Sequence, residues 1–331
     1  MRVECYDASS RAQRVIAPTQ PPGRTSTPVV LQPLGRAAVM PLDAGRVGQP
    51  PRKDVPLNDA KPAQQSFIDK HHFLLRRLHS LSGIAPIGAF LIPHLTTNSS
   101  IVWGNLLGSS HLDPAALEAA GIVAHPGVEM FQHEVNFIHG LPALLLIEIF
   151  VLWLPIAFHA GFGIVFARSG KSNLSHYGYE HNWRYMLQRL SGYLGVLFIF
   201  LHLASLRWGW TFGGLLPGFK ADFAASTTAA HLQHNPFTAV FYMVCVLGLV
   251  YHFANGLWTA AITWGLTVTV PAQRRWGYVC TALGIGLAGM AAAAVVGFAT
   301  LDVESARTIE TMMVGDPVAA AAVADATDPA P

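Results

Sequence analysis

Four histidines lie inside long apolar segments of this chain, each in a different segment. They are His94, His159, His202 and His252. Ionisable side chains are expensive inside a membrane, so their presence there indicates a function. Neutral imidazole is a strong axial ligand for haem iron, and helix bundles build cofactor sites from side chains on facing helices. Four histidines on four helices therefore suggest two irons, each held by two imidazoles.

The segments that carry these histidines are long enough to cross a bilayer. Of 331 residues, 52% are hydrophobic and 12% are charged, about half the charged fraction of a soluble domain. Backbone groups in lipid must be satisfied internally, which requires helices of about 20 residues. We predict an all-α integral membrane five-helix bundle that binds two haems. Its spans are about 74–97, 138–167, 187–208, 237–265 and 276–300.

Basic residues gather on one side of the predicted bundle. They precede the first span, fill the link between the second and third, and separate the fourth from the fifth. By contrast, the link 98–137 contains no lysine or arginine, and the link 209–236 contains only Lys220. Positively charged loops stay in the cytoplasm, so we place the N-terminus inside and the C-terminus outside.

The flanks of the membrane domain, which we assign to residues 70–300, lack long apolar runs. Residues 1–69 are rich in Pro, Gly, Arg and Ala, and we predict a disordered cytoplasmic extension. Residues 301–331 are predicted to form an extracytoplasmic tail. The three cysteines are widely spaced, and no C-x-x-C-H motif for covalent haem attachment is present.

The direction of each span fixes the depth of its histidine, at 1.5 Å per residue. The first and third spans place His94 and His202 roughly 31 and 22 Å from the inner face. The second and fourth run the other way and place His159 and His252 roughly 31 and 22 Å from the outer face. The sequence therefore predicts an outer pair, His94 with His202, and an inner pair, His159 with His252.

Glycines flank the histidines at helical spacing. Gly163 and Gly256 follow the second-span and fourth-span histidines by one turn, on the same helix face. Glycine lets a flat macrocycle approach the backbone closely, so we predict that both contact the cofactor. The first and third spans carry comparable glycines, and the two successive helix pairs look like two versions of one hairpin. These further glycines are Gly83, Gly88, Gly192 and Gly195.

The motifs around these residues resemble a known family. The chain reads R-R-L-H-S-L-S-G at 76–83, F-L-I-P-H-L at 90–95, F-H-A-G-F-G at 158–163, N-W-R-Y-M-L-Q-R-L-S-G at 182–192, Y-H-F-A-N-G-L-W at 251–258 and T-W-G-L-T-V-T-V at 263–270. Together they resemble the cytochrome b membrane-anchor subunit of succinate dehydrogenase, in its single-chain, five-helix, di-haem type. The resemblance covers roughly residues 70–300.

The resemblance implies a role in electron transfer without succinate chemistry of its own. It implies two haem b groups, with His94, His159, His202 and His252 as axial ligands. Flavoprotein and iron–sulfur subunits would dock on the cytoplasmic face of a bacterial-type cytoplasmic membrane, and electrons would pass through the inner and then the outer haem to a membrane quinone. The resemblance implies no catalytic residue in this chain and no nucleic-acid partner.

Three residues, Glu148, His79 and Arg77, are candidates for a quinone site, and quinone reduction also consumes protons. Glu148 lies 11 residues before His159, about three turns, so we expect it on nearly the same face of the helix. A buried, protonated carboxyl there would be a suitable donor, or it would simply bond a neighbouring helix or haem edge. His79, next to Arg77, would contact a quinone or a haem propionate, or serve the structure alone. Prolines 93 and 155 are predicted to bend their helices within the preceding turn.

Two other functions fit parts of the pattern. An anchor of a fumarate reductase would run the same electron path backwards, and this chain alone does not decide the direction. A transporter would use intramembrane histidines to relay protons or bind a metal. Transporters usually show inverted repeats and broken helices at the midplane, and neither signal is present in the sequence.

Overall fold

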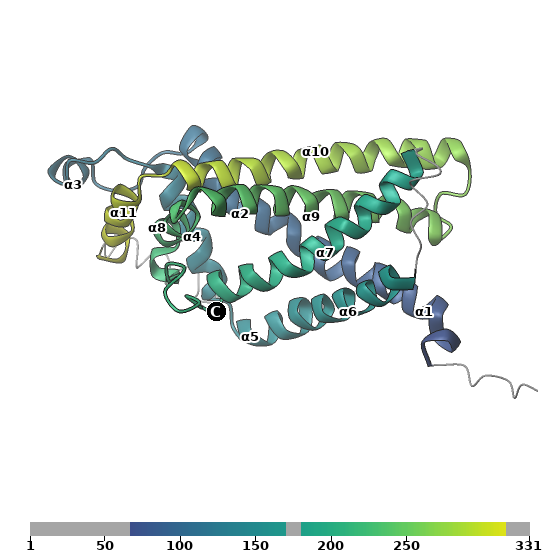
Figure 1. Cartoon of the computed structure of the whole chain (residues 1–331). Coiled ribbons are helices and arrows are strands. Elements are labelled where there is room, and N and C mark those ends of the chain that lie inside the picture. The colour runs from purple at the N-terminus through teal and green to yellow at the C-terminus, as the bar shows by residue number, and fades with distance from the viewer. Residues whose placement is uncertain (1–66, 170–179, 316–331) are drawn as a thin grey trace, which may run out of the picture. The chain divides into compact units, whose positions relative to one another are not determined.

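The computed structural model describes residues 67–169 and 180–315. Within these ranges all regular structure is helical, as predicted, and five helical segments are long and apolar enough to cross a membrane (Figure 1). The first is α1 (Phe67–Ser82), η1 (Gly83–Ile87) and α2 (Gly88–Leu107); the second is α5 (Leu144–Ile147), η2 (Glu148–Trp153) and α6 (Leu154–Ser169); the others are α7 (Glu180–Leu206), α9 (Pro236–Thr263) and α10 (Val270–Thr300).

The flanks and ends of these helices differ from the expected bounds. The extension predicted at 1–69 lies outside the described residues except for its last three, which begin α1. The second span starts at Leu144 instead of residue 138, because α4 (Pro126–His139) ends at His139 and a turn follows. That turn contains Ala143 in the left-handed region, with φ 56°, which an L-residue rarely adopts inside a helix.

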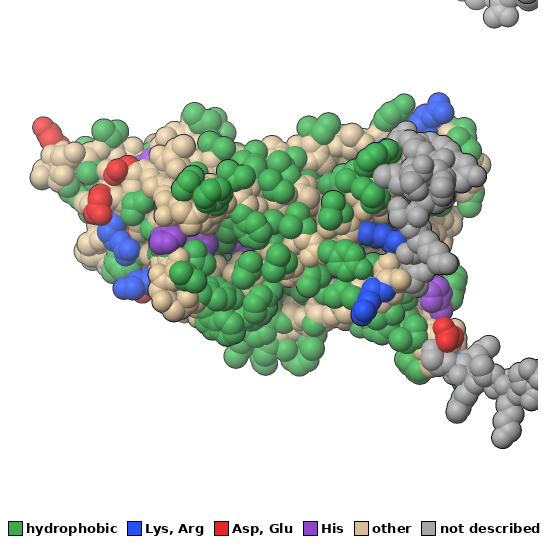
Figure 2. Space-filling model, viewed as in Figure 1, with side chains coloured by type: hydrophobic (Ala, Val, Ile, Leu, Met, Phe, Trp, Pro, Cys, Tyr) green, Lys and Arg blue, Asp and Glu red, His purple; other side chains and the backbone are tan. Residues whose placement is uncertain are grey.

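The sides of the bundle present apolar side chains. Leu145, Phe150 and Leu190 are 55%, 64% and 57% exposed. Figure 2 shows hydrophobic side chains across the middle of the molecule, with charged ones gathered at its two ends. An exposed apolar band of this kind is explained by contact with lipid, because water would disfavour it.

Two of the spans contain a π-helical turn, and each is associated with a proline. Pro86 lies inside η1, and Pro155 is the second residue of α6, which follows η2. A proline lacks the backbone N–H that an α-helix uses, and a π turn re-routes the hydrogen bonds around it. A π turn thus lies within one turn before Pro155, and Pro93 lies inside the α-helix α2. The bend predicted at each of these prolines stays a prediction.

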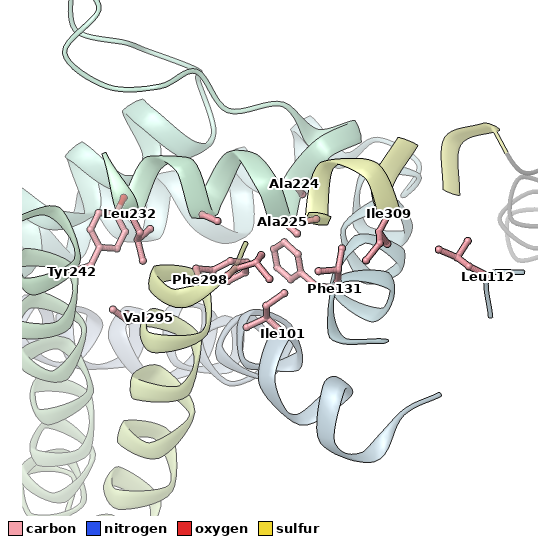
Figure 3. Close-up of a cluster of buried hydrophobic side chains, with 14 of the residues drawn as sticks. Ile101, Leu112, Phe131, Ala224, Ala225, Leu232, Tyr242, Val295, Phe298 and Ile309 are labelled. Carbon is pink, nitrogen blue, oxygen red and sulfur yellow. The ribbon is translucent and has the colours of Figure 1, made fainter. Parts of the chain in front are cut away.

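Short helices pack together at the end of the bundle where α2 and α7 finish; we call them the cap. They are α3 (Pro114–Ala119), α4, η3 (Ala221–Phe223), α8 (Ala224–Gln233) and α11 (Val303–Gly315). Their core includes Ile101, Phe131, Ala225, Phe298 and Ile309 (Figure 3). The opposite end, where α1 begins and α6 finishes, carries most of the arginines of the described residues and is called the basic end.

Part of the predicted tail belongs to the cap. Residues 303–315 of the tail form α11, in which Glu310 is fully buried. The Glu310 carboxylate accepts hydrogen bonds from the backbone N–H groups of Ala225 and Ser226 and from the Ser226 hydroxyl. The tail could not be read as structured from its composition, because alanine and isolated acidic residues are common in both helices and disordered chains.

Candidate cofactor site

The structure brings both predicted histidine pairs together inside the bundle. His159 of α6 and His252 of α9 form the pair nearer the basic end, with ring centres 6.1 Å apart and ring planes at 81°. His94 of α2 and His202 of α7 form the pair nearer the cap, with ring centres 5.8 Å apart and the same angle. All four side chains are partly buried.

The basic-end pair is oriented by backbone carbonyls. Nδ1–H of His159 donates to the carbonyl oxygen of His79 at 2.8 Å, and Nδ1–H of His252 donates to that of Gln188 at 3.0 Å. The hydroxyls of Ser82 and Ser191 lie 3.4 and 3.3 Å from the same nitrogens. A histidine whose Nδ1 donates to a carbonyl keeps its proton there, which leaves Nε2 as a lone-pair donor for a metal.

The cap-end pair is oriented mainly by aromatic packing. His94 stacks on Phe90 at 5.0 Å between ring centres, and His202 stacks on Phe198 at 5.4 Å; both angles are 24°. Nδ1 of His94 lies 3.4 Å from Nδ2 of Asn98, while Nδ1 of His202 is buried without a hydrogen-bond partner. This pair therefore depends less on hydrogen bonds than the basic-end pair does.

The separation of the rings fits an axial pair of imidazoles. An imidazole nitrogen binds a metal ion at about 2 Å, so two rings on opposite sides of one ion have centres about 6 Å apart. Within residues 67–169 and 180–315, no group of three or more His, Cys, Asp or Glu side chains could hold a metal ion. A bare ion would need such a group, whereas a haem supplies four ligands itself and needs only two from the protein.

The glycines lie against neighbouring side chains. A Cβ added at Gly83 would meet Cε1 of His159 at 2.5 Å, and one at Gly192 would meet Cε1 of His252 at 3.1 Å. At Gly163 it would meet Cε1 of His79 at 3.1 Å, and at Gly256 it would meet the side-chain nitrogen of Gln188 at 3.5 Å. At Gly163 a side chain would crowd His79, whereas the distance at Gly256 is an ordinary van der Waals contact. The contact of these two glycines with a cofactor stays a prediction.

His79 lies beside the basic-end pair. Its ring stacks on that of His159 at 4.0 Å, and its Nδ1 is buried without a hydrogen-bond partner. Arg77 is exposed and lies over the ring of Phe73, with its guanidinium carbon 4.4 Å from the ring centre. These two quinone candidates are therefore at the basic end of the molecule.

Glu148 lies towards the cap end and is paired with an arginine. Nε and Nη2 of Arg207 donate to the two carboxylate oxygens at 2.7 and 2.8 Å. The pair is two-pronged and charge-assisted, which fixes the orientation of the Glu148 carboxylate. The expectation of a shared face with His159 assumed an unbroken α-helix, but η2 changes the register between the two residues.

Arg207 is a partner of Glu148 that the sequence analysis did not predict. Arg207 is the second-last residue of the predicted span 187–208, where an arginine is ordinarily explained by the end of the apolar segment. The available signal was an arginine next to an apolar run, opposite a lone intramembrane carboxylate. Charges inside a membrane are usually paired, so Glu148 itself predicts a cationic partner on a neighbouring helix.

The chain is similar to a known respiratory protein. The chain is 33% identical over 226 residues to the succinate dehydrogenase cytochrome b558 subunit of Bacillus subtilis (strain 168). The match covers 68% of this chain and 96% of that relative. No protein-family model matches the chain, and no solved structure matches it.

Proposed function

Because the chain belongs to the family of succinate dehydrogenase cytochrome b subunits, we propose that it is the di-haem membrane anchor of a succinate dehydrogenase complex. The observation that carries this proposal is the meeting of four intramembrane histidines in two pairs, at 5.8 and 6.1 Å between ring centres. Both distances suit axial imidazoles on one iron.

The four histidines would hold two haem b groups. His159 and His252 would ligate the inner haem and His94 and His202 the outer one, in each case through Nε2. When bound, the haems would carry single electrons between the soluble subunits of the complex and a membrane quinone. The protein's own contribution is to fix the ligands, separate the two sites along the bundle and exclude water.

The distribution of charge supports an orientation. The basic end carries Arg76, Arg168, Arg184 and Arg275, and positively charged loops stay in the cytoplasm. We therefore place the basic end inside, with flavoprotein and iron–sulfur subunits docked on it, and the cap outside. The chain would contain no catalytic residue for succinate oxidation. Whether the complex runs towards succinate oxidation or fumarate reduction depends on the quinone and on those partners.

Glu148 is our candidate for the quinone site at the cap end. With its carboxylate fixed by Arg207, Nη1 of the same guanidinium has no hydrogen bond within the described residues and can donate to a quinone oxygen. Glu148→Gln should lower quinone turnover and inhibitor affinity; unchanged values would remove Glu148 from the site. His79 and Arg77 are the candidates at the basic end, and His79→Gln tests them by the same two measurements.

A reduced-minus-oxidised spectrum of the purified complex tests the proposal directly. Two low-spin b-type haems per chain are expected. One haem per chain would contradict the paired assignment, and the absence of haem would favour the transporter alternative. An apo chain refolded with haem provides the control, because its spectrum should show two equivalents bound at saturation.

A further inference from the structure

Two segments of the chain repeat each other around the basic-end pair. L-H-S-L-S-G at 78–83 matches L-Q-R-L-S-G at 187–192, and F-H-x-x-x-G at 158–163 matches Y-H-x-x-x-G at 251–256. The two L-x-x-L-S-G segments lie on the first and third spans. The two segments with H-x-x-x-G lie on the second and fourth spans. Both copies have the same order along the chain.

The matching residues make matching contacts. The carbonyl of the second residue in each L-x-x-L-S-G segment, His79 or Gln188, accepts from Nδ1–H of the histidine on the following span. The serine hydroxyl lies within 3.4 Å of that nitrogen in both copies, and the glycine lies against the imidazole ring. Equivalent sequence positions therefore perform the same task twice.

The repeat continues to the cap-end pair. Phe90 precedes His94 by one turn and stacks on it at 24°, and Phe198 precedes His202 by one turn and stacks on it at the same angle. Each of the four spans thus contributes one histidine, and each histidine has a counterpart in the other copy with the same kind of neighbour.

The spacing from the glycine to the cap-end histidine differs between the first and third spans. His94 follows Gly83 by 11 positions, whereas His202 follows Gly192 by 10. In a regular helix, one additional residue would rotate His94 by about 100° away from its partner. The first copy contains the π turn η1 between these positions, and the second copy is α-helical throughout. A π turn closes from residue i to i+5, so it holds one residue more than an α turn.

We infer that the first four spans are two copies of one ligand-holding hairpin, and that η1 takes up a single additional residue so that His94 still faces His202. In each copy the serine–glycine pair and the carbonyl before it are positioning elements for the basic-end ligand. This inference rests on the proposed haem function, because the ligands it concerns are those of the two haems.

Two matched deletions test the register. Deletion of Pro86 shortens the first copy to the length of the second, and η1 should then close as an ordinary α turn. Deletion of Val196, a partly exposed residue between Gly192 and His202 in the third span, should rotate His202 away from His94. The complex with the first deletion is expected to keep both low-spin haem signals in electron paramagnetic resonance spectra. The second deletion should abolish the cap-end signal.

Each outcome of the deletion experiment decides the inference. Loss of the cap-end signal on deletion of Pro86, or failure of that chain to accumulate in membranes, would overturn it. Retention of both signals on deletion of Val196 would overturn it as well. A wild-type complex without two haems would instead refute the proposed function, so the two failures are distinguishable.

Point variants test the positioning role. Gly83→Ala must displace the His159 ring, because the new Cβ would lie 2.5 Å from it, whereas Gly161→Ala on α6 meets nothing within 4 Å. We expect the basic-end signal to shift or disappear in the first variant and to stay unchanged in the second. His79→Gln keeps the backbone carbonyl and copies the residue of the second hairpin, so haem content should be retained. An unaltered basic-end signal in Gly83→Ala would refute the role of the glycine.

Discussion

The two histidine pairs use the same type of side chain but are held by different contacts. At the basic end, backbone carbonyls bind both Nδ1 atoms, and two glycines allow the neighbouring helices to approach the rings. At the cap end, phenylalanines stack on the rings, and Nδ1 of His202 has no partner. Backbone acceptors are fixed by helix geometry, whereas stacked side chains are fixed only by packing. The cap-end pair should therefore depend more on its surroundings.

Replacement of one histidine in a pair should have the largest effect, and the effect should be confined to the haem of that pair. His252→Ala should eliminate the basic-end haem, and His202→Ala should eliminate the cap-end haem, because one imidazole remains in each case and cannot complete a low-spin site. Haem content per complex and the two low-spin signals measure the effect. Loss of the same signal in both variants would show that the pairs are not independent sites.

The cap should support the cap-end pair selectively. Glu310→Ala leaves the N–H groups of Ala225 and Ser226 buried without acceptors, at a cost of about 2–4 kcal/mol. The cap core reaches the ligands through Tyr242, whose ring centre is 6.0 Å from that of His202. We expect a lower thermal midpoint and a weakened cap-end haem signal, with the basic-end signal preserved. Glu304→Ala on the exposed face of α11 is the matched control.

The Arg207–Glu148 pair should have a smaller effect on the same end. Arg207→Ala leaves the Glu148 carboxylate buried without its partner, and the Arg207 side chain is 35% exposed, so we expect a loss of about 1–3 kcal/mol. Double replacement with Glu148→Gln should recover part of the stability, because no unpaired charge remains. Thermal unfolding of the two variants measures this. Equal stability of the single and double variants would contradict the pairing argument.

A change of pH should have the smallest of these effects, and it should act on the stability of the cap. His231 of α8 is buried and bonds the Tyr242 hydroxyl at 3.1 Å, and burial lowers its pKa from 6.5 to about 4. The unfolded chain therefore binds more protons between these values, so stability falls as pH drops from 6.5 towards 4. We expect a loss on the order of 1–2 kcal/mol between pH 7 and 5.

His231→Gln provides the control for the pH experiment. Burial raises the pKa of Glu310, which makes stability fall as pH rises and acts in the opposite sense. The difference between the wild type and His231→Gln, taken from thermal midpoints at each pH, isolates the histidine. A pH-independent difference would show that the His231 imidazole keeps its ordinary affinity for protons in the folded protein.

Sequence reasoning predicted what depends on the constant rise of a helix. The depth argument pairs His94 with His202 and His159 with His252, and the structure brings the same residues together. It succeeded although η1 and η2 interrupt two of the spans, because a single π turn changes depth by little. Each π turn also rotates the residues after it around the helix axis. The face predicted for Glu148 assumed an unbroken α-helix up to His159, and η2 interrupts that helix.

Features that depend on distant contacts could not be predicted. Arg207 and Glu148 lie 59 positions apart, and the burial of Glu310 requires α8 to present its first backbone N–H groups to α11. No local pattern in 98–137 or 301–315 predicts that helices from both segments pack in one cap. Its polar residues look solvated until the packing of the helices is known.

The positions of the irons test the central claim most directly. Anomalous scattering at the iron edge, or a density map of the purified complex, should place one iron between Nε2 of His159 and His252. It should place a second between Nε2 of His94 and His202. Irons coordinated by other residues, or packed side chains filling the space between each pair, would contradict this account.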